Sequence, residues 1–217
     1  MIRGAIFDLD GTLLDSNPYW DRAPEVYLAG LGIQAKSNLG LTIFPMTLPE
    51  AADFMIGEYS LTQTRQEVVT GVNAAMAQFY LHDVPCKAGV PALLDALRSR
   101  GIPCAVASVT DRPLVESALR RLGLLPYFSG IATTGEVGVG KQEPDVYLRA
   151  AELTGSIPTE TLVFEDALHA LKTAARAHFL TVGVYDDESA PAQEEMKGIA
   201  DFYLRDFSDL SALLSAI

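Results

Sequence analysis

From residue 89 onward, short apolar strand patterns alternate with helical patterns along the chain. The predicted strands are at 102–108, 130–134, 161–166 and 179–185, with a weaker one near 200–204. The predicted helices are at 89–101, 112–124, 144–152, 167–178 and 207–216. Strands separated by helices of this length form a parallel sheet with helices on both faces. We therefore expect an α/β fold, a doubly wound parallel sheet with a Rossmann-like core.

Residues 17–86 interrupt this alternation. They contain helical patterns at 19–32, 48–60 and 64–82 and no convincing strand, and the segment 37–47 is expected to be a loop. A further strand pattern, around Ile2 and residues 5–7, precedes the block. We predict a core of residues 1–16 and 87–217 with an α-helical cap inserted at 17–86. The connections near 15–18 and 85–89 would act as a hinge.

Composition and charge narrow the classes of partner. The chain has 217 residues, of which 49% are apolar and 20% charged, as in ordinary globular proteins. A net charge of −12 argues against nucleic acid, whose phosphates require a basic surface. No apolar run approaches the roughly 18 residues of a membrane span, and the first strand leaves no room for a signal peptide. With Cys86 and Cys104 too few for a disulfide framework, we expect reduced thiols and a cytoplasmic location.

Two aspartates end the first strand, in "GAIFDLDGTLLDS" at residues 4–16. Alternation along the strand places the side chains of Asp8 and Asp10 on the same side of the sheet. Like charges this close repel each other unless a cation, a proton or phosphate chemistry requires the pair. The alternative is an Asp-Gly turn with exposed carboxylates.

Further polar residues follow other predicted strands. Ligands of open parallel sheets bind beyond the carboxyl ends of the strands, where this sequence places Asp8, Asp10, Ser108, Glu165 and Asp166, with Lys141 in a nearby loop. Four acids require a hard cation, and ligands that are all oxygen atoms suit Mg²⁺. The hydroxyl and the lysine would bind the remaining oxygens of a phosphoryl group. Taken singly, these residues could equally be a helix cap, a surface charge and an acidic first helical turn.

The segments "DLDGTLLDS", "ASVT", "GKQEPD" and "FEDALHALKTAARA" occur in this order along the chain. They resemble the four motifs of the haloacid dehalogenase superfamily, most closely its β-phosphoglucomutase and phosphoglycolate phosphatase branch. The resemblance spans the whole chain. It implies a doubly wound core with a helical cap inserted after the first motif, and Mg²⁺ as cofactor.

The resemblance also implies a role for each motif residue. Asp8 would be the nucleophile that forms an aspartyl-phosphate, Asp10 the general acid and base, and Lys141 the cation that bridges Asp8 and the phosphate. The phosphoryl group would bind to Ser108 and to the backbone N–H of Val109. The metal would be held by Asp8, the backbone carbonyl of Asp10, Asp166 and Glu165. The chain departs from the family pattern with Gln142 in place of proline, Val109 in place of serine or asparagine, Ala167 in place of serine, and "ARAHF" (175–179) in place of "AAGM". These departures bear on substrate subclass and loop rigidity and remove no charged catalytic group.

The resulting prediction is a magnesium-dependent phosphatase for a small phosphorylated metabolite, acting as a monomer or weak homodimer without nucleic acid or membrane. Haloacid dehalogenases and phosphonatases resemble this pattern but lack an aspartate at the position of Asp10, so its presence here favours phosphate-ester chemistry. A sugar phosphomutase is the alternative, although residues 40–50, which match the mutase loop for the second phosphate, contain no arginine or lysine. The basic residues between the first motif and the return of the chain are Arg22, Lys36, Arg65 and Lys87. A non-catalytic binding module is the third possibility.

Overall fold

The computed structural model describes residues 1–43, 46 and 48–217, and the chain divides into two compact units. Unit 1 consists of Met1–Asp15 and Pro85–Ile217, and unit 2 of Ser16–Val84. The sequence patterns placed these boundaries after residue 16 and before residue 87. Both divisions therefore lie slightly earlier in the structure than the patterns indicated.

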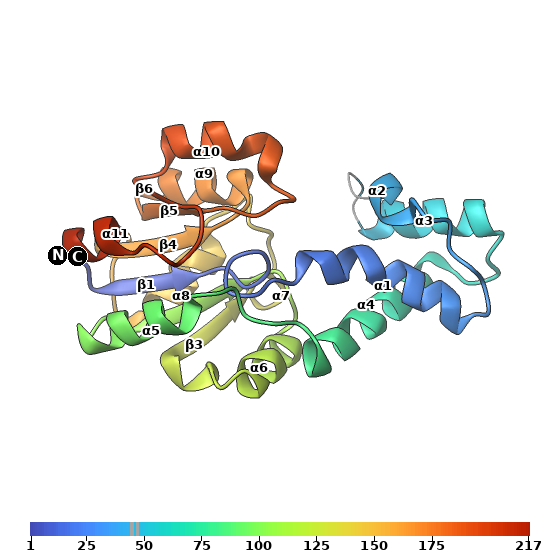
Figure 1. The fold of residues 1–217 in the computed structure, drawn as a ribbon, viewed down its shortest axis with the longest axis horizontal. Coiled ribbons are helices and arrows are strands. Elements are labelled where there is room, and N and C mark those ends of the chain that lie inside the picture. The colour runs from blue at the N-terminus through green and yellow to red at the C-terminus, as the bar shows by residue number, and fades with distance from the viewer. Residues whose placement is uncertain (44–45, 47) are drawn as a thin grey trace. The chain divides into compact units, whose positions relative to one another are not determined.

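Six parallel strands form one sheet in the described part of unit 1 (Figure 1). The strands are β1 (Gly4–Phe7), β2 (Cys104–Ser108), β3 (Phe128–Thr133), β4 (Thr161–Glu165), β5 (Leu180–Val184) and β6 (Phe202–Leu204). Their order across the sheet is β3-β2-β1-β4-β5-β6. This is the order of the doubly wound dinucleotide-binding folds, so the predicted α/β class and the parallel sheet are confirmed.

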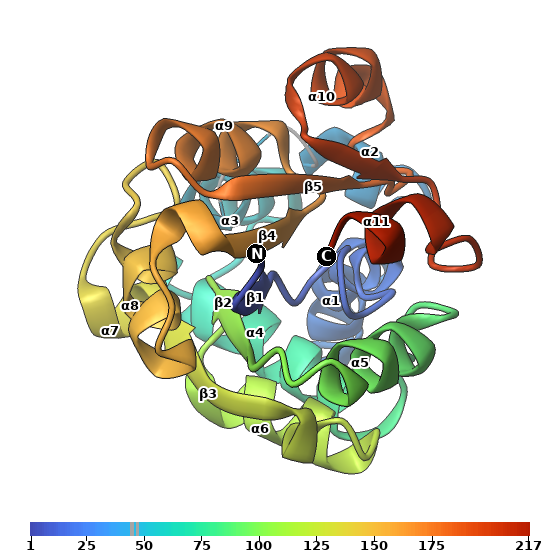
Figure 2. The same cartoon turned by 90° about the vertical axis from the view of Figure 1, so that its left-hand side faces the viewer.

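Helices cover both faces of this sheet, with α8 and α9 on one face and α5 and α11 on the other (Figure 2). The helices of unit 1 are α5 (Val90–Ser99), α6 (Arg112–Arg121), α7 (Thr134–Val137), α8 (Asp145–Thr154), α9 (Leu168–Arg176), α10 (Gln193–Ile199) and α11 (Ser211–Ala216). Single 3₁₀ turns lie at Leu125–Tyr127, Pro158–Glu160 and Ala190–Ala192. No helix in the described part of the chain is long and apolar enough to cross a membrane.

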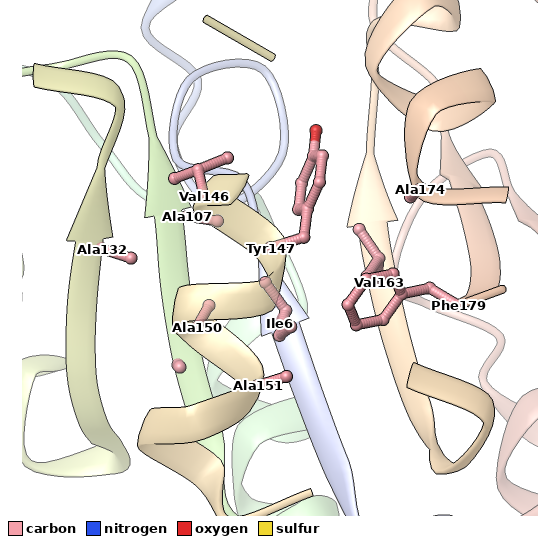
Figure 3. Packing of buried hydrophobic residues seen from close by; sticks show 11 residues of the cluster. Ile6, Ala107, Ala132, Val146, Tyr147, Ala150, Ala151, Val163, Ala174 and Phe179 are labelled. Atoms are coloured by element: carbon pink, nitrogen blue, oxygen red, sulfur yellow. The ribbon is translucent and has the colours of Figure 1, made fainter. Parts of the chain in front are cut away.

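Small residues on the strands allow α8 to pack closely against the sheet. Ala105 and Ala107 of β2 and Ala132 of β3 are buried in one apolar cluster with Ala150 of α8 (Figure 3). An added Cβ at Gly130 would lie 2.9 Å from a terminal methyl group of Leu153 on α8, so this side chain would have to shift. The position of α8 relative to the sheet is therefore determined by small side chains, and this matters for the residues that α8 carries.

Two segments whose sequences are typical of loops contain helices. The acidic composition of residues 186–195 is typical of a solvated loop, but this stretch includes a 3₁₀ turn and the start of α10. Asp186 and Gln193 within it are buried, and Asp186 forms an ion pair with Lys87, so part of the stretch is packed against the rest of unit 1 and not solvated. In 37–47, residues Leu39–Ile43 form α2, while residues 44, 45 and 47 lie outside the described residues.

Unit 2 is a bundle of α1 (Asn17–Gly30), α2, α3 (Leu48–Tyr59) and α4 (Arg65–His82). Helix α1 packs against α2 and α4, and α3 packs against α4. Gly71 of α4 lies so close to the ring of Tyr27 on α1 that an added Cβ would come within 2.1 Å of it. A capping box, in which Thr64 and Glu67 satisfy each other's backbone N–H groups, begins α4. The three helices that the periodicity predicts are all present.

The two connections between the units pair with each other inside unit 1. Leu14 and Cys86 form an isolated antiparallel bridge. The N–H of Asp15 donates to the carbonyl of Pro85 at 3.0 Å, and the N–H of Lys87 donates to that of Leu13 at 2.9 Å. The chain therefore leaves unit 1 and returns to it at adjacent points.

Candidate active site

The candidate site lies at the carboxyl ends of β1 and β4. These two strands are neighbours in the sheet although most of the chain separates them in sequence, because the order of strands reverses here. Ligands of doubly wound sheets bind at such a reversal point. Asp8 directly follows β1, and Glu165 and Asp166 lie at the end of β4. Gly11, with a φ of +78°, turns the chain sharply after Asp8, which few other residues could do without strain.

One lysine joins the ends of the two strands. Lys141 Nζ donates to Asp8 Oδ1 and, at 2.6 Å, to Glu165 Oε1, and all three side chains are buried. Burial alone would lower the pKa of Lys141, but the charges of Asp8 and Glu165 outweigh it and raise that pKa above its usual value. Lys141 is therefore a permanent cation. Burial raises the pKa of Asp8 to about 6, and Lys141 opposes this shift.

Three carboxylates form a group that could hold a metal ion. Asp8, Glu165 and Asp166 each offer an oxygen atom, and these atoms all lie within 4.8 Å of one another. Burial, together with the charges of Asp8 and Glu165, raises the pKa of Asp166. Glu165 Oε2 is buried and has no hydrogen-bond partner among the described residues. Because a buried carboxylate oxygen normally has a partner and the donors are all oxygen atoms, this group fits a hard divalent cation such as Mg²⁺.

Asp10 belongs to a second cluster, next to the end of β2. Its Oδ2 accepts a hydrogen bond from Thr110 Oγ1 at 2.7 Å, and the N–H of Thr110 donates to Ser108 Oγ at 3.0 Å. These hydrogen bonds connect the first motif to the second. The side chain of Asp10 is not in the group of three carboxylates, and the metal ligand expected from Asp10 was its backbone carbonyl. The side chain of Val109 is 59% exposed, so packing of that side chain does not account for this position.

Three hydroxyl groups of the site were missed in the sequence patterns. Thr110 is one, Thr12 is the second, donating to Asp166 Oδ1 at 3.1 Å, and Tyr147 is the third, donating to Glu165 Oε1 at 2.7 Å. Both threonines lie inside the quoted motifs "DLDGTLLDS" and "ASVT", so their position was a usable signal. Tyr147 lies on α8, beyond the "GKQEPD" motif, where only the packing of that helix brings it to Glu165.

The loop of Lys141 is held from α9. The carbonyl of Gln142 accepts hydrogen bonds from Thr173 Oγ1 and from an Arg176 guanidinium nitrogen, both at 3.3 Å. Arg176 also donates to Thr173 Oγ1 at 2.9 Å, which ties the two donors together. These contacts fix the residue next to Lys141 at the position where the family pattern has a proline.

The sequence from residue 2 to residue 178 matches the family model described as haloacid dehalogenase-like hydrolase. With this match over most of its length, the chain belongs to the haloacid dehalogenase-like hydrolases, and the resemblance read from its four motifs is confirmed. The chain is therefore an enzyme, and relatives of it in this family are named as phosphatases.

Two curated relatives cover nearly the whole chain. It is 29% identical to hexitol phosphatase B of Escherichia coli (strain K12), over 97% of this chain and 95% of that one. It is 28% identical to validoxylamine A 7'-phosphate phosphatase of Streptomyces hygroscopicus subsp. limoneus, over 97% and 96%. Among solved structures, CbbY from Rhodobacter sphaeroides in complex with phosphate has the same fold, with a TM-score of 0.80, 24% identity and 97% of both chains covered.

Proposed function

We propose that this chain is a magnesium-dependent phosphatase that hydrolyses a small phosphomonoester, a sugar phosphate or a similar metabolite, through an aspartyl-phosphate on Asp8. The observation that carries this proposal is the lysine shared between Asp8 and Glu165 beside a third carboxylate, Asp166. A carboxylate can attack an anionic phosphate only where nearby positive charge offsets the repulsion. The names of the curated relatives support the substrate class, because hexitol phosphatase B is one of them.

In this mechanism Asp8 attacks the phosphorus atom and the bond to the substrate oxygen breaks. Asp10 donates its proton to the leaving alkoxide and later accepts a proton from the water that attacks the aspartyl-phosphate. Ser108 and the backbone N–H of Val109 bind phosphoryl oxygens, and Lys141 offsets charge on Asp8 and the phosphate. A magnesium ion, held by Asp8, Asp166, Glu165 and the carbonyl of Asp10, supplies further neutralisation of the phosphoryl charge when bound.

The basic residues between the first motif and the return of the chain already have partners, which favours a hydrolase over a mutase. Lys36 forms an ion pair with Glu58, and Arg65 pairs with Asp53 at 2.6 Å. Lys87 pairs with Asp186 at 2.6 Å. The remaining one, Arg22, lies over the rings of Tyr19 and Phe79, 5.9 and 5.3 Å from their centroids. A mutase that holds a bisphosphate intermediate would need at least one of these cations to be available.

We assign unit 2 as the cap that selects the substrate body, acting through the hinge expected near 15–18 and 85–89. Short connections that pair with each other suit a lid, which must exclude water during phosphoryl transfer and then admit it. A cytoplasmic location and a monomer or weak homodimer remain predictions from the sequence.

A panel of phosphorylated metabolites, assayed for phosphate release with Mg²⁺, tests the proposal. We expect hydrolysis of at least one sugar or sugar-alcohol phosphate, complete loss of that activity in excess chelator, and recovery when Mg²⁺ is restored. The Asp8→Asn variant is the negative control, because it lacks the nucleophile for every substrate. Undiminished phosphate release in chelator, or by Asp8→Asn, contradicts the proposal.

A further inference from the structure

Tyr147 is a fully buried side chain with two different environments. Its ring belongs to the apolar cluster between α8 and the sheet, and it meets the ring of Phe179 edge-on with centroids 6.2 Å apart. Figure 3 shows the hydroxyl beyond the arrowheads of the neighbouring strands, at the end of the sheet where the candidate site lies. There it donates to Glu165 Oε1 at 2.7 Å. The ring is thus part of the core and the hydroxyl part of the site.

The two oxygens of Glu165 are in unequal positions because of this contact. Oε1 accepts from both Tyr147, at 2.7 Å, and Lys141, at 2.6 Å, whereas the buried Oε2 has no partner among the described residues. Burial and the charge of Glu165 raise the pKa of Tyr147, so the hydroxyl keeps its proton and stays a donor. The contact therefore fixes one oxygen and leaves the other available.

Lys141 is the second group affected by this contact. Its single ammonium group binds both Asp8 and Glu165, so the two carboxylates compete for it. Each hydrogen bond that Glu165 accepts from another group weakens its attraction for Lys141. Without the Tyr147 hydroxyl, Lys141 would be the remaining donor to Oε1 and would move toward Glu165, away from the nucleophile.

We propose that the Tyr147 hydroxyl is a positioning group that holds Glu165 with Oε2 available to a divalent cation and keeps Lys141 shared with Asp8. This inference rests on the proposed function, which it deepens by adding a residue that supports the metal-binding carboxylate. Groups that orient metal ligands through hydrogen bonds typically change metal affinity or activity by about 10–100-fold when they are removed.

The test is a calorimetric titration of Mg²⁺ into Tyr147→Phe in the absence of substrate. Phenylalanine keeps the ring and its apolar contacts, and it removes only the hydroxyl. We expect the Kd for Mg²⁺ to rise by about 10–100-fold, and kcat on a phosphomonoester to fall even at saturating Mg²⁺. The matched control is Tyr203→Phe, which loses a hydroxyl that donates to Gln193 Oε1 at 2.6 Å in the same unit. It should bind Mg²⁺ as the wild type does.

A second comparison shows whether Tyr147 acts through Glu165. In a Glu165→Gln background, Tyr147→Phe should cause no further change in Mg²⁺ affinity, because the charge that it orients is already gone. Losses that multiply in the double variant contradict the inference. Thermal unfolding in chelator checks that both tyrosine variants are folded, since each loses one hydrogen bond.

The outcomes separate this inference from the proposed function. If wild type binds Mg²⁺ and releases phosphate while Tyr147→Phe has the same Kd and kcat, the inference is overturned and the phosphatase stands. If wild type itself neither binds Mg²⁺ nor releases phosphate, the proposed function fails and the inference fails with it, and this is evident before any variant is made.

Discussion

At the scale of single residues, the candidate site contains two carboxylates with different partners. Asp8 accepts a hydrogen bond from Lys141, a cation that opposes the rise of the Asp8 pKa caused by burial. Asp10 accepts a hydrogen bond from the neutral hydroxyl of Thr110, at 2.7 Å. A nucleophile must be ionised, whereas an acid must carry a proton at the moment of transfer. The lysine beside Asp8 therefore agrees with the role of nucleophile proposed for this aspartate.

Substitution of Asp10 by asparagine separates these roles. The variant keeps the backbone carbonyl and the shape of the side chain but cannot transfer a proton, so we expect kcat to fall by about 10²–10⁴-fold. The fall should be smaller for an aryl phosphate, whose leaving group needs little protonation. Rates of the phosphorylation step for an alkyl and an aryl phosphate check this, and equal losses would rule out the acid role. A large decrease in Mg²⁺ affinity would show that the side chain, and not the carbonyl, binds the metal.

Removal of the Thr110 hydroxyl tests whether the orientation of Asp10 matters. Thr110→Val keeps the volume but removes the hydrogen bond to Asp10, and a hydrogen bond to a carboxylate contributes about 1.5–3 kcal/mol. We expect kcat to fall by about tenfold or more. Thr181→Val is the matched control. Thr181 of β5 is also buried, and its hydroxyl donates to the aspartate Asp201 at 3.0 Å. Stopped-flow or steady-state rates that fall equally in both variants would contradict a role in the site.

Which of these residues the sequence could predict depends on how they are held. Asp8 and Asp166 follow strands, and strands in a parallel sheet end at one edge, so the strand pattern predicts that both residues lie at this edge. That β1 and β4 are neighbours there comes from the order of the strands. The contact of Tyr147 with Glu165 depends on the rotation of α8 and on its close approach to the alanines of β2, which periodicity does not determine. The hydrogen bonds that Thr173 and Arg176 donate to the carbonyl of Gln142 likewise join a loop to a later helix.

At the scale of elements, the start of α5 depends on one glycine. Gly89 is the N-cap of this helix and has a φ of +85°, which favours glycine. An added Cβ would also lie 2.5 Å from the carbonyl oxygen of Phe207, on the segment before α11. Gly101, just after α5, has a φ of +70° and nothing within 4 Å of an added Cβ. At both positions a positive φ would strain any residue other than glycine, and the two positions differ in the crowding around an added Cβ.

This pair gives a prediction for stability. Gly101→Ala should lower the free energy of unfolding by about 1–2 kcal/mol, the strain of a left-handed conformation. Gly89→Ala adds the displacement of the Phe207 backbone, and overpacking of this kind contributes about 1–3 kcal/mol more. Urea unfolding of the two variants measures the difference. Equal losses would show that the contact with Phe207 yields without strain.

The elements that the sequence patterns missed are short or lack a clear apolar face. Helix α10 lies in an acidic stretch whose composition is typical of a solvated loop, and its burial comes from Gln193 and Met196 together with the loop that carries Asp186. Helix α2 has five residues, fewer than two turns, so periodicity has little to detect. The long helices and all six strands, with β6 as the weaker one, were predicted because each has an apolar run or face of its own.

At the scale of the whole molecule, each unit contains a natural probe of its unfolding. The single tryptophan, Trp20, lies in unit 2. Cys104 lies in β2 of unit 1, where burial raises the pKa of its thiol to about 12. A thiol reagent attacks the thiolate, so Cys104 should react only after unit 1 has unfolded.

Mg²⁺ should shift one of these probes and leave the other in place. In a Cys86→Ser background, saturating Mg²⁺ should raise the urea midpoint for exposure of Cys104, because an ion at 100 times its Kd stabilises the folded unit by about 2.7 kcal/mol. The Trp20 fluorescence transition should not move, since the residues proposed to bind the metal all lie in unit 1. Chelator should reverse the shift. A joint shift of both probes would mean that the two units unfold as one.

The pairing of Leu14 with Cys86 also affects how much chain entropy unit 1 must give up when it folds. A disordered segment from Ser16 to Val84 would oppose this pairing by about 4 kcal/mol, from the length-dependent part of loop closure. Folded unit 2 removes most of that opposition, because the rings of Tyr19 and Phe79, 5.1 Å apart, hold the start of α1 beside the end of α4. With unit 2 folded, the insertion therefore opposes the pairing of Leu14 with Cys86 about as little as a tight turn would. Variants that melt unit 2 should therefore weaken the sheet through the connectivity of the chain alone, without altering a single contact inside it.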